Sequence, residues 1–110
     1  MNYTLVVVEA PDVGRAPFRA LSFARALKSS GHHLQRVFFY GPGVRIGLAW
    51  EGSPQQAWHD FATEMGSELL LCSASADRWQ IKTPPEGFDI AGLGSLMEAG
   101  MDSDRVITFA

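Results

Sequence analysis

Four short runs of apolar and β-branched residues recur along the chain, and segments with helical periodicity separate them. The runs cover residues 3–8, 35–40, 69–72 and 105–109. The first run, Tyr3 to Val8, has no polar alternation, which is typical of a strand covered on both faces. Strands that alternate with helices predict an α/β domain with a mainly parallel sheet. We therefore expect one three-layer α/β/α domain that spans residues 1–110.

The segments between these runs carry signals for helices. Pro17 suits a first helical turn, and apolar residues then recur at helical spacing up to Leu27. Ser53-Pro54 predicts the start of a second helix, with Trp58 on its core face. Further helices are expected at residues 73–79 and around 93–97, and the state of residues 44–50 is left open.

Composition narrows the classes of function. At 110 residues, the chain is long enough to bury about two-thirds of its unfolded surface. Nine basic residues against twelve acidic ones give a net charge of −3, which disfavours direct binding of nucleic acid. No apolar stretch approaches the roughly 20 residues of a membrane span, and the amino terminus lacks the basic region of a signal peptide. We expect a cytoplasmic protein that binds no membrane.

Cys72, the sole cysteine, lies where the third apolar run ends and a run of small residues begins. A single cysteine forms no internal disulfide. A thiol at a strand-to-helix junction meets free backbone N–H groups, which favour the reactive thiolate form. We expect this sulfur to be reachable from solvent. The alternative is plain packing, because free cysteine is among the most buried residue types.

Two other strand ends are expected at the same edge of the sheet as Cys72. They are 10–14 and the Tyr40-Gly41-Pro42-Gly43 segment. Reactive groups gather outside the carboxyl ends of parallel strands. Tyr40 and Gly41 are therefore candidate neighbours of the sulfur.

Other motifs point to no cofactor or metal. Gly92-Leu93-Gly94-Ser95 resembles a glycine-rich turn, but it lacks the GxGxxG spacing and no obvious strand precedes it. A helix-entry role is the more frequent one for such glycines. The three histidines do not have the spacing of metal ligands. No serine occupies a GxSxG elbow, which disfavours hydrolase chemistry.

Several segments, in order along the chain, resemble the TusD/DsrE family of sulfur-relay subunits. Residues 36–44 read RVFFYGPGV and resemble the family's VFFY-x-x-GV segment. Residues 71–78 read LCSASADR and resemble its C-V-A-A-A-x-R stretch, whose cysteine accepts sulfur. Residues 87–99 resemble its GF-x-x-x-GLG-x-L-x-EA segment, and residues 23–27 resemble its first helix. The resemblance covers nearly the whole chain.

The resemblance implies a sulfurtransferase subunit in which Cys72 carries a persulfide. A TusA-like carrier would donate the sulfur, and a TusE/DsrC-like protein would accept it, for 2-thiouridine formation in tRNA or for sulfur oxidation. TusB/DsrH-like and TusC/DsrF-like subunits would complete a hetero-oligomer. By spacing, Arg78 is expected to hold negative charge near the sulfur, and Ser73 and Ser75 to donate hydrogen bonds to it.

The chain departs from this family after Arg78. Trp79-Gln80 stand where the family has a basic residue and a glycine, and the segment that follows, up to Glu86, is shorter. This shortening affects the rim of the site and the choice of partners. Two alternative functions remain, a non-catalytic assembly subunit with a buried Cys72 and a small-ligand binding domain that uses the same crevice.

Overall fold

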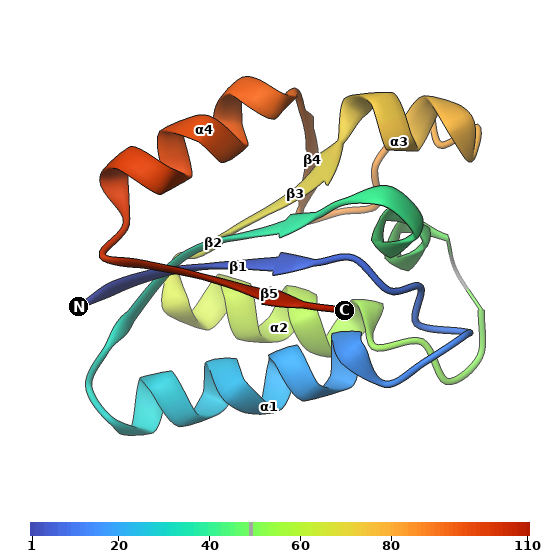
Figure 1. The fold of residues 1–110 in the computed structure, drawn as a ribbon. Helices are drawn as coiled ribbons and strands as arrows, with labels where there is room; N and C mark the ends of the chain where they lie inside the picture. Colours follow the sequence, from blue (N-terminus) through green and yellow to red (C-terminus); the bar gives the residue numbers. More distant parts are fainter. Residues whose placement is uncertain (49) are drawn as a thin grey trace.

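A parallel β-sheet forms the middle layer of the molecule in the computed structural model, which describes residues 1–48 and 50–110 (Figure 1). Within those residues the sheet has five strands, in the order β4-β3-β2-β1-β5, and every adjacent pair is parallel. The strands are β1 (Asn2–Val7), β2 (His33–Phe39), β3 (Glu68–Cys72), β4 (Phe88–Ala91) and β5 (Arg105–Phe109). The expected α/β class and parallel sheet are confirmed.

Helices lie on both sides of this sheet. They are α1 (Ala16–Ser29), α2 (Gln55–Met65), α3 (Ser73–Arg78) and α4 (Leu93–Asp102), and a 3-10 helix, η1, covers Gly41–Gly47. In Figure 1, α1 and α2 lie below the sheet, whereas α3 and α4 lie above it. None of the helices in the described part of the chain has the length and apolar character that crossing a membrane requires.

The layer of α1 and α2 is fixed to the sheet by aromatic side chains. Trp58 is fully buried, and its ring meets that of Phe39 edge-on at 5.9 Å between centroids. Its indole N–H also donates a hydrogen bond to the Pro17 carbonyl oxygen at 3.2 Å, which ties α2 to α1. The expected core positions of Trp58, Phe38 and Phe39 are confirmed, since all three are 0% exposed.

Strand β4 was not expected from the sequence. No strand was expected before Gly92, yet residues 88–91 pair with β3 in register from Leu69–Phe88 to Cys72–Ala91. The open stretch 44–50 begins within η1, and Ala49 in that stretch lies outside the described residues. The second helix begins at Gln55 with Pro54 as its N-cap, one residue later than the Ser53 N-cap predicted.

The parallel arrangement sorts the ends of the strands into two edges. Every strand begins at one edge of the sheet and ends at the other, so the two ends of the chain lie at opposite edges (Figure 1). The carboxyl edge holds the last residues of β2 and β3. Tyr40, Gly41 and Cys72 therefore come together there, as the sequence predicts.

Candidate functional site

Cys72 occupies a junction without an intervening loop. It is the last residue of β3 and also the N-cap of α3, with φ −59° and ψ 124°. The backbone leaves the extended conformation at this residue and enters the helix at Ser73. The predicted strand-to-helix position of the sulfur is thus confirmed.

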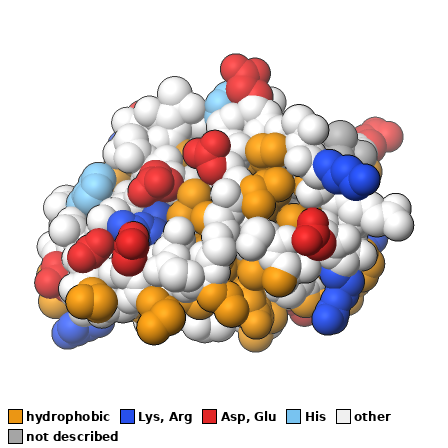
Figure 2. Space-filling view, turned by 90° about the horizontal axis from the view of Figure 1, so that it is seen from above, with side chains coloured by type: hydrophobic (Ala, Val, Ile, Leu, Met, Phe, Trp, Pro, Cys, Tyr) orange, Lys and Arg blue, Asp and Glu red, His pale blue; other side chains and the backbone are white. Residues whose placement is uncertain are grey.

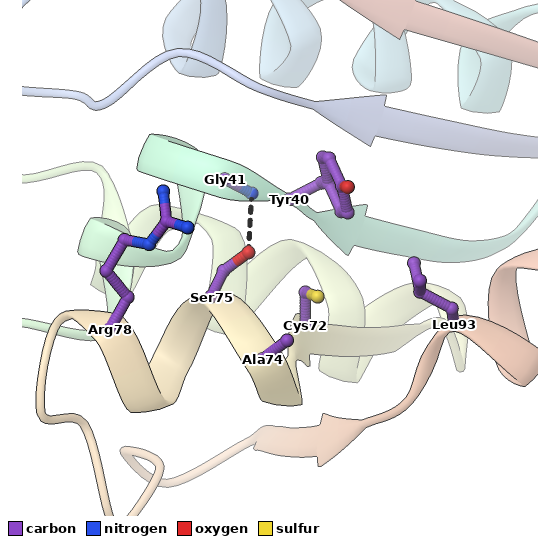
Figure 3. A pocket seen from close by; sticks show the side chains of 7 residues that line it. All are labelled: Tyr40, Gly41, Cys72, Ala74, Ser75, Arg78 and Leu93. Carbon is purple, nitrogen blue, oxygen red and sulfur yellow. Dashed lines mark hydrogen bonds between the residues drawn. The ribbon is translucent and has the colours of Figure 1, made fainter.

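A pocket of about 210 Å³ lies beside this junction. Its walls come from the β2–η1 turn, from α3 and from the first residue of α4 (Figure 3). The lining residues are Tyr40, Gly41, Cys72, Ala74, Ser75, Arg78 and Leu93. Besides Cys72, four of these residues were expected around the sulfur, whereas Ala74 and Leu93 were not.

The Cys72 sulfur lies at the floor of the pocket rather than on the outer surface of the protein. Cys72 is only 1% exposed, so the expected access from solvent depends on the pocket that this residue lines. Two other lining residues are more exposed than Cys72, Tyr40 at 39% and Leu93 at 50%. Figure 3 draws the sulfur between these two side chains and on the pocket side of α3. A reactant reaches Cys72 by entering this pocket.

A hydrogen bond joins two walls of the pocket. The Gly41 N–H donates to the Ser75 Oγ at 3.0 Å, which ties the β2–η1 turn to α3 (Figure 3). This bond leaves the Ser75 hydroxyl proton free to point elsewhere, because the oxygen acts as the acceptor. Ser75 thus has a structural role that sequence reasoning did not predict.

Glycines shape the same turn. Gly41 has a φ of +57°, a conformation that favours glycine. At Gly43, an added Cβ would lie 2.2 Å from the Val7 carbonyl oxygen, so β1 and η1 pack closer than any other residue allows. The Gly-Pro-Gly sequence therefore holds the rim of the pocket against the carboxyl end of β1.

Arg78 and Ser73 differ in their relation to the pocket. The exposed Arg78 side chain lines it and brings a positive charge to its wall (Figure 3). Ser73 does not line it, and its hydroxyl lies 3.9 Å from where a Cβ of Gly92 would stand. The expected hydrogen bond from Ser73 to the sulfur stays a prediction.

A stacked arginine borders the segment after α3. The Arg45 guanidinium lies 5.0 Å from the centroid of the Trp79 ring and pairs with the Asp12 carboxylate at 2.5 Å. Trp79 is half-buried by this contact. The side chain thus covers the chain's own surface at the point where the sequence departs from the family pattern.

The chemistry available at this site is that of a thiol. Within the described residues, no three His, Cys, Asp or Glu side chains group together as a metal site requires. A single cysteine lacks the second sulfur needed for an internal disulfide, but it exchanges sulfur with thiols and persulfides from other molecules. Arg78 contributes a permanently protonated guanidinium to the lining of the same pocket.

Comparison with known proteins adds independent findings. Residues 1–109 match the model of the DsrE/DsrF-like family. The chain is 36% identical to the sulfurtransferase TusD homolog of Vibrio parahaemolyticus, over 99% of this chain and 98% of that one. It is 34% identical to sulfurtransferase TusD of Salmonella newport, over 99% and 100% of the two chains.

A solved structure agrees with these matches. The ychN protein from E. coli superposes with a TM-score of 0.85 and 29% identity, over 99% of both chains. The sequence alignments extend over 128 positions, more than the 110 residues of this chain, because the relatives carry residues that this chain lacks.

Proposed function

Because the chain belongs to the DsrE/DsrF-like family, we propose that it is a sulfur-relay subunit in which Cys72 carries sulfane sulfur as a persulfide. The names of its curated relatives, sulfurtransferases TusD, support the expectation of a sulfurtransferase. The single observation that carries the assignment to Cys72 is its place in the floor of the pocket.

The transfer consists of two thiol exchanges. The Cys72 thiolate attacks the outer sulfur of a donor persulfide, so that one S–S bond forms at Cys72 and the donor's S–S bond breaks. The donor leaves as a thiolate, and electrons balance without an oxidant. An acceptor thiolate then attacks the outer sulfur of the Cys72 persulfide and restores the Cys72 thiolate.

The pocket residues support these exchanges in different ways. Arg78 stabilises the negative charge of the persulfide and of the leaving thiolate, because its guanidinium stays protonated. Ser75 and Gly41 hold the pocket walls together through their hydrogen bond. Because Cys72 is only 1% exposed, donor and acceptor reach its sulfur through the pocket.

The partners in this proposal are those of the TusD and DsrE relays. A TusA-like protein donates the sulfur and a TusE/DsrC-like protein accepts it, within an oligomer with TusB/DsrH-like and TusC/DsrF-like subunits. The sulfur goes to tRNA 2-thiouridine or comes from sulfur oxidation. The reaction takes place in the cytoplasm, where cysteine thiols are kept reduced.

Mass spectrometry after incubation with a persulfidated TusA-type carrier tests the proposal. We expect the protein to gain one sulfur atom at Cys72 and the Cys72→Ser variant to gain none, because that change removes the nucleophile. A matched control moves the thiol by one residue, with Ser73→Cys in the Cys72→Ser background. We expect that control to load far more slowly, since Ser73 does not line the pocket. If the Cys72→Ser variant without a second change gains sulfur, the assignment to Cys72 is rejected.

The burial of Cys72 favours a second candidate function, a non-catalytic assembly subunit. In that case the thiol is a packing group, and the fold contributes interfaces only. Alkylation by iodoacetamide separates the two functions. A carrier cysteine reacts in the folded protein, whereas a packing cysteine reacts only after denaturation.

A further inference from the structure

Helix α4 exposes a row of large apolar side chains. Leu93, Met97 and Met101 are spaced four residues apart, so they form one stripe along the helix. They are 50%, 74% and 85% exposed, whereas Ala99 on the same helix is fully buried. These three residues are called the α4 stripe below. Figure 2 views the face of the molecule that carries α4 and shows several hydrophobic side chains at its surface.

The α4 stripe begins at the pocket of Cys72. Leu93 is both its first member and a lining residue of that pocket. With a rise of about 1.5 Å per residue, the stripe extends about 12 Å away from it. A protein that lies along α4 therefore has one end at the entrance to the sulfur site.

The charges around the α4 stripe are mainly negative. Helix α4 contains Glu98 and Asp102 and no lysine or arginine. Asp89 on β4 and Asp104 before β5 are exposed as well. Figure 2 shows acidic side chains beside hydrophobic ones on this face. A complementary surface would carry apolar side chains bordered by lysine or arginine.

We infer that the α4 stripe is the docking surface for the protein that delivers sulfur to Cys72, and that this protein binds with apolar side chains surrounded by basic ones. The inference rests on the proposed function. Short-lived complexes, which a relay requires, use small interfaces. Methionine also suits such a surface, because its flexible side chain adapts to the shape of a partner.

A second copy of this chain is a poorer occupant of the same surface. In a symmetric dimer through α4, the same patch of both copies would meet. Asp102 pairs with Arg36 at 3.8 Å, but Glu98 of the two copies would bring like charges to the interface, and like charges there oppose binding. Charge therefore favours a basic partner over self-association.

The test measures how fast Cys72 gains sulfur from two donors, the persulfidated TusA-type carrier and glutathione persulfide. The variant is Met97→Lys with Met101→Lys, which removes two apolar contacts and places positive charge against a basic partner. We expect the ratio of the carrier rate to the glutathione persulfide rate to fall about tenfold or more. The small donor enters the pocket without contacting these methionines.

A matched control places two lysines on the opposite layer. Ser22→Lys with Ala26→Lys puts them four residues apart on the exposed side of α1, and we expect the ratio to stay at the value of the unmodified protein. A third variant, Glu98→Lys, tests charge alone. It should slow the carrier reaction severalfold and reduce its dependence on salt concentration.

The outcomes separate this inference from the proposed function. If the unmodified protein gains sulfur from neither donor, the proposed function fails, and the inference with it. If both donors load the unmodified protein and the methionine variant keeps its ratio, the inference alone is overturned. It is also overturned if the methionine variant changes the molecular mass in light scattering, because the α4 stripe would then be an interface between copies.

Discussion

The two helical layers of this molecule differ in what they bury. Helix α1 places six residues in the core, and α2 adds Trp58, Phe61 and Ala62. Helix α3 buries Ala76 and helix α4 buries Ala99. The layer of α1 and α2 is therefore expected to supply most of the stability. The layer of α3 and α4 contributes the pocket walls and an exposed apolar surface.

This difference shows how one sheet serves two purposes. Strands covered by a well-packed layer hold the carboxyl edge in a fixed shape, which positions Cys72 and its neighbours. The opposite layer does not need to be packed as tightly, so its side chains are free for contacts with other molecules. The predictions below test this difference, from the largest expected effect to the smallest.

The largest effect is expected for Trp58→Ala. The change removes a fully buried ring together with its hydrogen bond to the Pro17 carbonyl oxygen. We expect a loss of about 3–5 kcal/mol in the free energy of unfolding, measured in urea. The matched variant, Trp79→Ala, removes a half-buried ring that contacts Arg45, and should cost only about 1 kcal/mol. Equal losses for the two variants would contradict the proposed division between the layers.

The next largest effect is expected at the rim of the pocket. Gly43→Ala places a Cβ 2.2 Å from the Val7 carbonyl oxygen, so the turn must move away from β1. We expect a loss of about 1–3 kcal/mol in the same measurement.

Gly100→Ala serves as the control on α4, where a Cβ would meet nothing within 4 Å. That change should stabilise the protein by about 0.5–1 kcal/mol, because alanine favours a helix more than glycine does. If both glycine variants lose stability alike, the turn is not held by the close approach to β1.

A smaller effect is expected for Ser75→Ala. The change removes the acceptor of the Gly41 N–H, and we expect a loss of about 1 kcal/mol in unfolding free energy. Ser73→Ala, its neighbour on α3, lines no part of the pocket and should change stability by less than about 0.5 kcal/mol. A Ser75→Ala variant as stable as the Ser73→Ala variant would show that the bond does not hold the two walls together.

The smallest effect is expected on the α4 stripe. Met97→Ala and Met101→Ala truncate side chains that are 74% and 85% exposed, so each should change the unfolding free energy by less than about 0.5 kcal/mol. A loss above 2 kcal/mol would mean that these side chains pack against another surface in solution.

The sequence predicts most of the fold because the strands are strongly apolar. The runs at 3–8, 35–40 and 69–72 are buried on both faces, and such strands are visible without alternation. Strand β4 is different, because it has four residues at the edge of the sheet and two of them are exposed. Its apolar signal is too short to separate from the surrounding loop, and pairing with β3 is what orders it.

The site was predictable where it depends on the strand ends and on the helix that follows Cys72. Parallel strands bring Tyr40, Gly41 and Cys72 to one edge, so their proximity follows from the fold class. Leu93 is the first residue of α4, which follows the unpredicted strand β4. No local sequence pattern indicates that Leu93 lines the pocket. The depth of the sulfur depends on side chains from several elements, so the local sequence around Cys72 does not reveal it.

The opposite placement of the two chain ends has a practical consequence for labelling. A fluorophore or affinity tag joined to Ala110 emerges at the same carboxyl edge as the end of β3, with β2 and β1 lying between β3 and β5. The same label joined to Met1 emerges at the opposite edge. Assays of partner binding should therefore attach reporters and immobilisation handles at the amino terminus, because that end lies at the edge away from the pocket.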